Sequence, residues 1–216
     1  GLPFNSVIAL ELHGGKPLSP LVNAGAIATT SLINAENVEQ RWQRILHIQQ
    51  QLAGEQVALS DEVNQSEQTT NFHNRAIAWL LYSAGYLYCD AMEACDVYTR
   101  QCSTLLNTVE LATLGATLAA GGVNPLTHKR VLQADNVPYI LAEMMMEGLY
   151  GRSGDWAYRV GLPGKSGVGG GILAVVPGVM GIAAFSPPLD EEGNSVRGQK
   201  MVASVAKQLG YNVFKG

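Results

Sequence analysis

The 216 residues carry a formal net charge of −4, and only 15% of them are charged, so the chain has no basic surface suited to nucleic acid or an anionic membrane. Hydrophobic residues make up 47% of the chain, enough to fill the core of one large domain or two small ones. No apolar run approaches the length of about 20 residues that spans a bilayer. A small molecule is therefore the expected ligand.

The first third of the chain predicts two helices after a short strand. Val7–Leu12 lies among glycines and prolines and is predicted to be a strand within loops. The segment 22–33 is built from small and apolar residues, which is typical of a helix buried on all sides. Asn23 at its start is either an N-cap or a ligand-binding residue. The segment 35–52 is an amphipathic surface helix.

The segment 66–82 predicts one continuous helix with a polar group on its apolar face. Glu67, Asn71 and Asn74 are spaced by four and three residues, so on a single helix they share one face. A buried carboxylate and two amides need partners, and the ammonium and carboxylate of a free amino acid would serve. The alternative is a capping residue followed by a solvated first turn.

Further helices are expected at 90–101, which carries Tyr98, at 111–120 after a helix start at Asn107–Glu110, and at 134–149 and 195–209. A glycine-rich turn at 150–155 presents Tyr150.

Cys89, Cys95 and Cys102 are spaced by six and seven residues, which fits none of the usual zinc motifs. We interpret the three cysteines as small buried residues in a reducing cytoplasm.

The stretch 159–173 is the most unusual part of the chain, because Lys165 and Ser166 stand among glycines that leave the backbone open to a ligand. It is a ligand site or a tight packing corner.

Two apolar strands at 172–176 and 179–185, joined at Pro177-Gly178, should follow it and lie in a sheet covered on both faces. The pattern disfavours a phosphate loop, since Arg159 stands where the first glycine of that motif belongs and a strand follows the lysine in place of a helix. Penicillin-binding enzymes and class A β-lactamases place a similar Lys-hydroxyl-Gly strand beside a serine nucleophile.

Taken together, these motifs resemble the serine-dependent glutaminases from Leu2 to Asn212. The segments that carry the resemblance are 22–26, Glu67 with Asn74, 98–103, 161–171 and 185–195. It implies an α/β chain of the α+β type, with a β-lactamase-like or penicillin-binding-protein-like fold and a mixed antiparallel sheet packed against a largely helical lobe. We expect one continuous domain over 1–216, with the helical lobe at 22–150 and the hairpin and closing helix at 151–216.

The resemblance also implies a function and a set of site residues. The function is hydrolysis of L-glutamine to L-glutamate and ammonia, without a metal or organic cofactor, by a cytoplasmic homo-oligomer (a dimer or a tetramer) that binds neither nucleic acid nor membrane. Lys165 and Tyr150 would take part in catalysis, and the backbone N–H of Val168 would serve as an oxyanion donor. The implied glutamine-binding residues are Asn23, Glu67, Asn74, Tyr98, Tyr150 and Val168.

The family's nucleophile is the serine of a Ser-x-x-Lys pair that lies upstream of the segment 22–26. The sole such pair in this sequence is Ser204 with Lys207, after all the other motifs, and we interpret it as a chance match. We therefore expect these 216 residues by themselves not to turn over glutamine. Two alternatives stay open: another serine acyl hydrolase of the same fold, acting on β-lactams or peptides, or a non-catalytic fragment for binding or oligomerisation.

Overall fold

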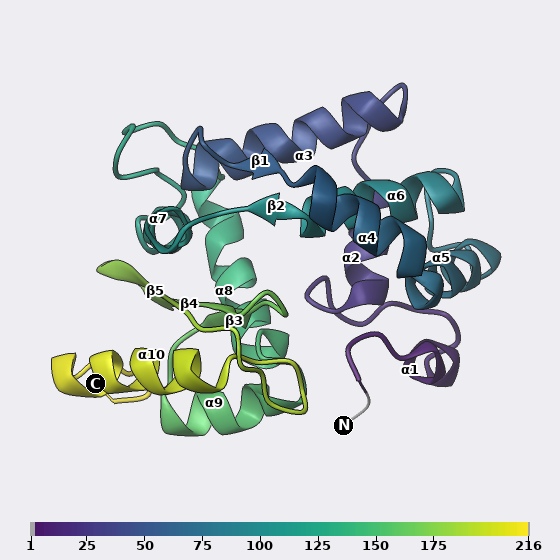
Figure 1. Ribbon diagram of the computed structural model, residues 1–216. Coiled ribbons are helices and arrows are strands. Elements are labelled where there is room, and N and C mark those ends of the chain that lie inside the picture. The colour runs from purple at the N-terminus through teal and green to yellow at the C-terminus, as the bar shows by residue number, and fades with distance from the viewer. Residues whose placement is uncertain (1–2, 216) are drawn as a thin grey trace. The chain divides into compact units, whose positions relative to one another are not determined.

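The computed structural model describes residues 3–215 and divides the chain into two compact units, one formed by residues 1–49 and 57–105 and the other by 50–56 and 106–216 (Figure 1). The first unit is mainly helical. Its elements are α1 (Val7–Leu12), α2 (Asn23–Ser31), most of α3 (Val38–Ala53), β1 (Ala58–Leu59), α4 (Asp61–Thr70), α5 (Phe72–Ser83), α6 (Ala91–Cys102) and β2 (Thr104–Leu105).

The second unit combines helices with a three-stranded sheet. Its elements are α7 (Thr108–Ala119), η1 (Ala134–Asn136), α8 (Val137–Glu147), η2 (Tyr150–Arg152), α9 (Ser153–Arg159), β3 (Gly164–Ser166), β4 (Gly171–Val176), β5 (Met180–Phe185) and α10 (Val196–Leu209).

The core of the first unit lies where α2, α5 and α6 meet. Ile27 of α2 and Ile77 and Leu81 of α5 are fully buried there. The small residues of α2 allow the neighbouring backbone to come close. A Cβ on Gly25, for example, would overlap the carbonyl oxygen of Ser19. The predicted buried helix is therefore confirmed, and its N-terminal residue Asn23 is held against two other helices.

Two predicted elements of the first unit were wrong. Val7–Leu12 is a helix rather than a strand, because the hydroxyl of Ser6 accepts a hydrogen bond from the N–H of Ala9 (3.1 Å) and caps the first turn. The predicted helix at 66–82 is two helices, α4 and α5, that meet at Asn71.

The sheet of the second unit is antiparallel, in the order β3-β4-β5. Lys165 on β3 pairs with Leu173 on β4, and the hairpin of β4 and β5 turns at residues 177–179. The hairpin, the helix after Asn107 and the closing helix are confirmed. The helix α9 was not predicted, since the glycine-rich sequence before it was interpreted as a turn.

The strand β4 is apolar on both faces because each face is covered by helix (Figure 1). Ile172, Ala174 and Val176 pack with residues of α9 and α10 in one buried cluster. On the opposite face α7 crosses β4 and β5, where a Cβ on Gly181 would overlap the carbonyl oxygen of Ala112. The sheet that carries Lys165 is therefore held rigid by close packing on both faces.

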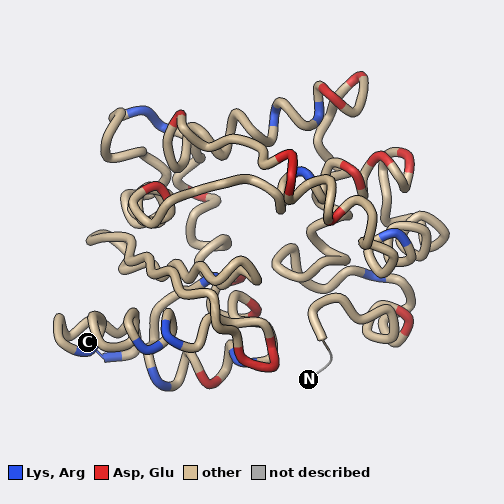
Figure 2. Tube along the Cα trace, viewed as in Figure 1, with Lys and Arg blue, Asp and Glu red and all other residues tan. Residues whose placement is uncertain are grey.

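The negative charge of the chain belongs to the first unit, which has five Lys and Arg residues against nine Asp and Glu, whereas the second has nine of each (Figure 2). An acidic surface favours a ligand that bears a cationic group. Among residues 3–215, no cluster of three or more His, Cys, Asp or Glu side chains is arranged to hold a metal ion. In the same residues, no helix combines the length and apolar character needed to cross a membrane.

Candidate functional site

Three of the predicted site residues meet in the first unit, although they come from three different helices. The side-chain amide of Asn23 on α2 donates to Oδ1 of Asn74 on α5 (2.7 Å). The hydroxyl of Tyr98 on α6 donates to Oδ1 of Asn23 (3.1 Å). Tyr98 is 8% exposed and the two asparagines are half-buried, so the group lies at the edge of the core. The N-cap of α2 is Val22, so the interpretation of Asn23 as a capping residue was wrong.

Glu67 and Asn74 do not share one helical face, because the chain bends between them at Asn71. Asn71 is buried, and its amide donates to the hydroxyl of Thr99 on α6 (3.0 Å) while its oxygen accepts from Nε of Arg75 (2.8 Å). These bonds pull the backbone of Asn71 out of helical geometry, to a ψ of 37°. Glu67 is therefore exposed on α4, while Asn74 lies in the first turn of α5, which begins at Phe72.

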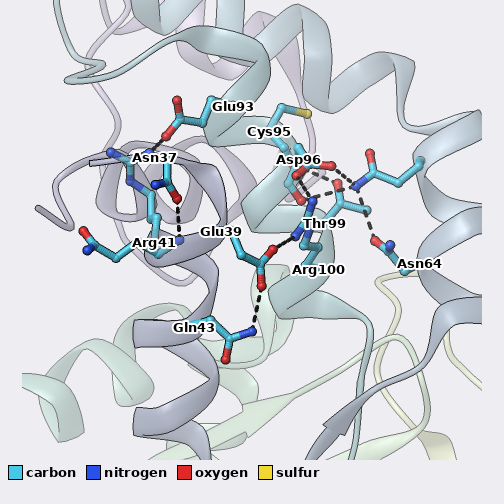
Figure 3. A network of polar contacts seen from close by, with 12 residues as sticks. Asn37, Glu39, Arg41, Gln43, Asn64, Glu93, Cys95, Asp96, Thr99 and Arg100 are labelled. Atoms are coloured by element: carbon cyan, nitrogen blue, oxygen red, sulfur yellow. Dashed lines mark hydrogen bonds and ion pairs between the residues drawn. The ribbon is translucent and has the colours of Figure 1, made fainter. Parts of the chain in front are cut away.

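A network of polar and charged side chains holds α4, which carries Glu67, against the rest of its unit (Figure 3). Gln68 donates to a carboxylate oxygen of Asp96 on α6 (2.7 Å). Asp96 also pairs with Arg100 (3.0 Å), which reaches Glu39 on α3 (2.9 Å). Polar contacts between α3, α4 and α6 thus fix the position of Glu67 relative to the helix of Tyr98. This network was not predicted, because its members are ordinary solvent-facing residue types far apart in sequence.

The second unit brings Tyr150 and Lys165 together. The ammonium nitrogen of Lys165 lies 3.4 Å from the phenol oxygen of Tyr150 and 4.5 Å from the centre of its ring. The phenol donates to the carbonyl oxygen of Ser166 (3.4 Å), which also accepts from the ammonium of Lys165. Tyr150 has a φ of 54°, in the left-handed region that non-glycine residues seldom occupy. Such strain is characteristic of functional sites.

Val168 lies in the turn between β3 and β4 and is 57% exposed. The turn is closed by hydrogen bonds from the N–H of Gly167 to Gly171 O (3.0 Å) and from the N–H of Gly170 to Gly167 O (2.9 Å). Within residues 3–215, the N–H of Val168 has no hydrogen-bond acceptor. That N–H can therefore donate to a ligand.

The position of Tyr150 depends on the close contact between Gly148 and β3. A Cβ on Gly148 would overlap the carbonyl oxygen of Gly164, and the carbonyl of Gly148 accepts from the N–H of Ser166 (3.0 Å). We expect Gly148→Ala to lower the free energy of unfolding by about 1–3 kcal/mol, because the strand must move away. Urea unfolding monitored by circular dichroism measures the loss.

Gly154→Ala is the matched control for that substitution, since Gly154 lies in α9 and its added Cβ would meet nothing within 4 Å. We expect it to be neutral or to stabilise the protein by up to about 1 kcal/mol, because alanine is the better helix former. Equal losses from the two substitutions would contradict the close contact at Gly148.

Ser204 and Lys207 do not form a nucleophile and base. Both residues are exposed on α10, and the hydroxyl of Ser204 accepts from Gln208 (3.1 Å), one turn further along. The chance-match interpretation of this pair is supported by that geometry.

The cysteines differ from one another in burial. Cys95 is buried, as expected, whereas Cys89 is half-buried and Cys102 is exposed. Burial raises the pKa of the Cys95 thiol to about 11, which leaves it protonated at neutral pH. It is therefore a core residue and not a nucleophile.

A cavity of about 190 Å³ lies elsewhere in the first unit, along α2. It is lined by Pro17, Leu18, Ser19, Pro20, Gly25, Ala28, Thr29, Leu32, Tyr86 and Tyr88. None of the seven predicted site residues lines it.

The family model and the related sequences all identify the same family. A family model described as Glutaminase matches residues 1–214. The chain is 99% identical over 216 residues to Glutaminase 1 of Escherichia coli (strain K12), a match that covers all of this chain and 70% of that protein. It is 74% identical over 215 residues to the Glutaminase of Desulfovibrio desulfuricans (strain ATCC 27774 / DSM 6949 / MB), of which it covers 69%.

Solved structures give the same result. A Bacillus glutaminase crystallised in the presence of 4.3 M NaCl matches 99% of this chain and 74% of its own, with a TM-score of 0.94 at 34% identity. The Bacillus subtilis glutaminase YbgJ, in its covalent complex with 5-oxo-L-norleucine formed by reaction with 6-diazo-5-oxo-L-norleucine, matches 98% of this chain and 79% of its own. Its TM-score is 0.88 at 31% identity. The fold is thus the expected β-lactamase-like α+β fold.

Proposed function

The chain belongs to the glutaminase family, and we propose that it hydrolyses L-glutamine to L-glutamate and ammonia through a γ-glutamyl ester on a serine. The observation that carries the proposed site is the convergence of Asn23, Asn74 and Tyr98, which lie up to 75 residues apart in sequence and form one hydrogen-bonded group. Packing alone does not require two amides and a phenol at this position, whereas recognition of a small polar molecule does.

This group and Glu67 are suited to the polar ends of an amino acid. The Glu67 carboxylate would accept from the α-ammonium of glutamine, in a unit whose excess of acidic residues favours a cation. The amides of Asn23 and Asn74 and the phenol of Tyr98 would donate to the α-carboxylate or the side-chain carbonyl. Because the four side chains are on four helices, α2, α4, α5 and α6, the tertiary fold of the first unit determines their spacing.

The chemistry requires a nucleophile, which we assign to the serine of an upstream Ser-x-x-Lys pair. Its lysine takes the proton from the serine hydroxyl as the oxygen attacks the amide carbon of glutamine. The C–N bond then breaks, ammonia leaves with a proton, and the γ-glutamyl ester remains. Water attacks the ester, the bond to serine breaks, and glutamate and the free serine are restored.

Three residues of the second unit would assist these steps. The N–H of Val168 would donate to the oxyanion that forms at the amide carbon, an interaction that in other enzymes lowers the barrier by about 3–4 kcal/mol. The phenol of Tyr150 would pass a proton to the departing ammonia. The ammonium of Lys165, 3.4 Å from that phenol, would hold its oxygen in place and favour its loss of a proton.

Labelling by 6-diazo-5-oxo-L-norleucine tests this mechanism, since a relative reacts covalently with that compound. We use the full-length protein, meaning this chain with the residues that complete it in its relatives. The expected result is one adduct per protomer, mapped by peptide mass spectrometry to the serine of a Ser-x-x-Lys pair outside these 216 residues. An adduct on Ser204, or hydrolysis of a chromogenic β-lactam in place of glutamine, would contradict the proposal.

The 216 residues purified alone are expected to release no ammonia from L-glutamine, because the proposed serine and lysine are not among them. A coupled glutamate dehydrogenase assay measures the release, with the full-length protein as the positive control. Turnover by the 216 residues above the blank would show that the nucleophile lies within them.

We further propose that the full-length protein is a cytoplasmic homotetramer. The outer face of α5 supports association, because Phe72, Trp79 and Tyr82 are 69%, 52% and 55% exposed. Light scattering on the full-length protein gives its mass directly, and a monomer at micromolar concentration would refute the tetramer.

A further inference from the structure

Asn194 is a fully buried polar residue near Tyr150, and the proposed mechanism assigns it no role. It lies between β5 and α10 in the second unit and has no exposed surface. Its amide nitrogen donates to the carbonyl oxygen of Leu149 (3.3 Å) and to Oδ1 of Asp190 (3.4 Å). Its oxygen accepts from the hydroxyl of Ser166. Asn194 therefore joins its own segment, 190–194, to Leu149 and Ser166, which lie 45 and 28 residues away in sequence.

The orientation of the Asn194 amide is determined by its neighbours. Leu149 O and the carboxylate of Asp190 are both acceptors, so they must face the nitrogen of the amide and leave its oxygen to Ser166. Asp190 stays ionised. Burial opposes its charge, but hydrogen bonds from the N–H groups of Asn194 and Glu192 and from the side chains of Gln199 and Asn194 outweigh burial and lower its pKa.

Two of the three partners of Asn194, Leu149 and Ser166, adjoin Tyr150, which carries the proposed catalytic phenol. The carbonyl of Leu149 belongs to the peptide group that joins Leu149 to Tyr150, whose φ of 54° must be held by its surroundings. The carbonyl of Ser166 accepts from the phenol of Tyr150 and from the ammonium of Lys165. The Ser166 hydroxyl donates a hydrogen bond to Asn194. Ser166 therefore cannot rotate away from Tyr150 without breaking a buried hydrogen bond.

We propose that Asn194 is a positioning residue, which holds the backbone of Tyr150 and the strand of Lys165 in the arrangement that proton transfer to ammonia requires. This inference rests on the proposed function. Ser166 has the same positioning role, because its hydroxyl is bonded to an amide oxygen and the residue is 2% exposed, so it holds the strand in place and does not bind substrate. Asn194 acts only through Tyr150 and Lys165, and touches no reacting atom.

A double-mutant cycle in the full-length protein tests the inference. Asn194→Ala is expected to lower kcat for L-glutamine about 10- to 100-fold, with KM changed less than about threefold, because a misplaced proton donor slows the chemical step. In a Tyr150→Phe background the same substitution should lower kcat by less than about threefold, since the group that it positions is already absent. Equal factors in the two backgrounds would overturn the inference.

Asn124→Ala is the matched control, because Asn124 is also buried in the second unit, at 2% exposure. Its amide donates to Gln51 O (2.8 Å) and its oxygen accepts from the N–H groups of Leu126 and Thr127. We expect Asn124→Ala to cost stability, yet to leave kcat per folded protein within about threefold of the parent. If Asn124→Ala lowered kcat as much as Asn194→Ala, both losses would reflect a general loss of packing in the second unit, and the inference would be overturned.

Ser166→Ala replaces Asn194→Ala in the cycle if the latter does not fold, since it removes one hydroxyl from the same contact. Ser166→Ala is expected to lower kcat in the parent protein much more than in the Tyr150→Phe background. Equal factors in the two backgrounds would overturn the inference. Ammonia release by the parent protein tests the proposed function separately. If the parent releases no ammonia, the function itself fails. If the parent is active and the cycle is additive, only the role of Asn194 fails.

Discussion

Tyr150→Phe in the full-length protein is expected to lower kcat for L-glutamine by about 100- to 1,000-fold, the range that general acid catalysis contributes. The phenol lies 3.4 Å from the ammonium of Lys165, and phenylalanine keeps the ring against that ammonium while it removes the proton donor. KM should change by less than about threefold, because the lost interaction belongs to the chemical step. Steady-state ammonia release measures both constants.

Tyr158→Phe is the control for that experiment. Tyr158 lies on α9 in the same unit and is 90% exposed, so loss of its hydroxyl should leave kcat and KM unchanged. If Tyr150→Phe retained the turnover of the parent protein, another group would have to protonate the departing ammonia. The strained φ of Tyr150 would then have a structural purpose only.

Glu67→Gln is expected to raise KM for L-glutamine about 10- to 100-fold, with a smaller effect on kcat. A charge-assisted hydrogen bond to the α-ammonium contributes about 1.5–3 kcal/mol to binding, and the neutral amide does not replace the lost charge. Glu67 is exposed on α4, and the contacts of Gln68 with Asp96 hold that helix in position, so the substitution should not disturb folding.

A substrate without the α-amino group makes that prediction specific. With glutaramate, the amide of glutarate, Glu67→Gln and the parent protein should show the same low kcat/KM, because the substrate has no ammonium for either protein to bind. Glu62→Gln, at another exposed position of α4, serves as the control for the change of charge. An unchanged KM for glutamine in Glu67→Gln would remove Glu67 from the recognition site.

The parts of the fold that the sequence predicts well are those where local pattern and packing agree. The apolar run at 172–176 lies in a strand covered on both faces, and the capping box of Asn107 and Glu110 begins α7 where expected. Val7–Leu12 was mispredicted because its short apolar pattern suits a strand or a helix, and the hydroxyl of Ser6 decides in favour of the helix.

The residues of the candidate site are predictions from the resemblance, whereas their geometry could not be predicted from the sequence. The resemblance supplied Asn23, Asn74 and Tyr98, and the structure brings these three together. The bend at Asn71 was not predictable, because it depends on a bond to Thr99, which is 28 residues away. Asn194 was missed for the same reason: its partners Leu149 and Ser166 lie 45 and 28 residues away, and a buried asparagine has no distinctive sequence pattern.

Ammonia release from L-glutamine by the full-length protein tests the assignment as a glutaminase most directly. The predicted result is saturable release of one ammonia for each glutamate formed, with a kcat/KM at least about 100-fold above that for glutaramate, since the α-ammonium contributes binding energy. Equal rates with the two substrates, or no release from glutamine by a folded full-length protein, would contradict the assignment.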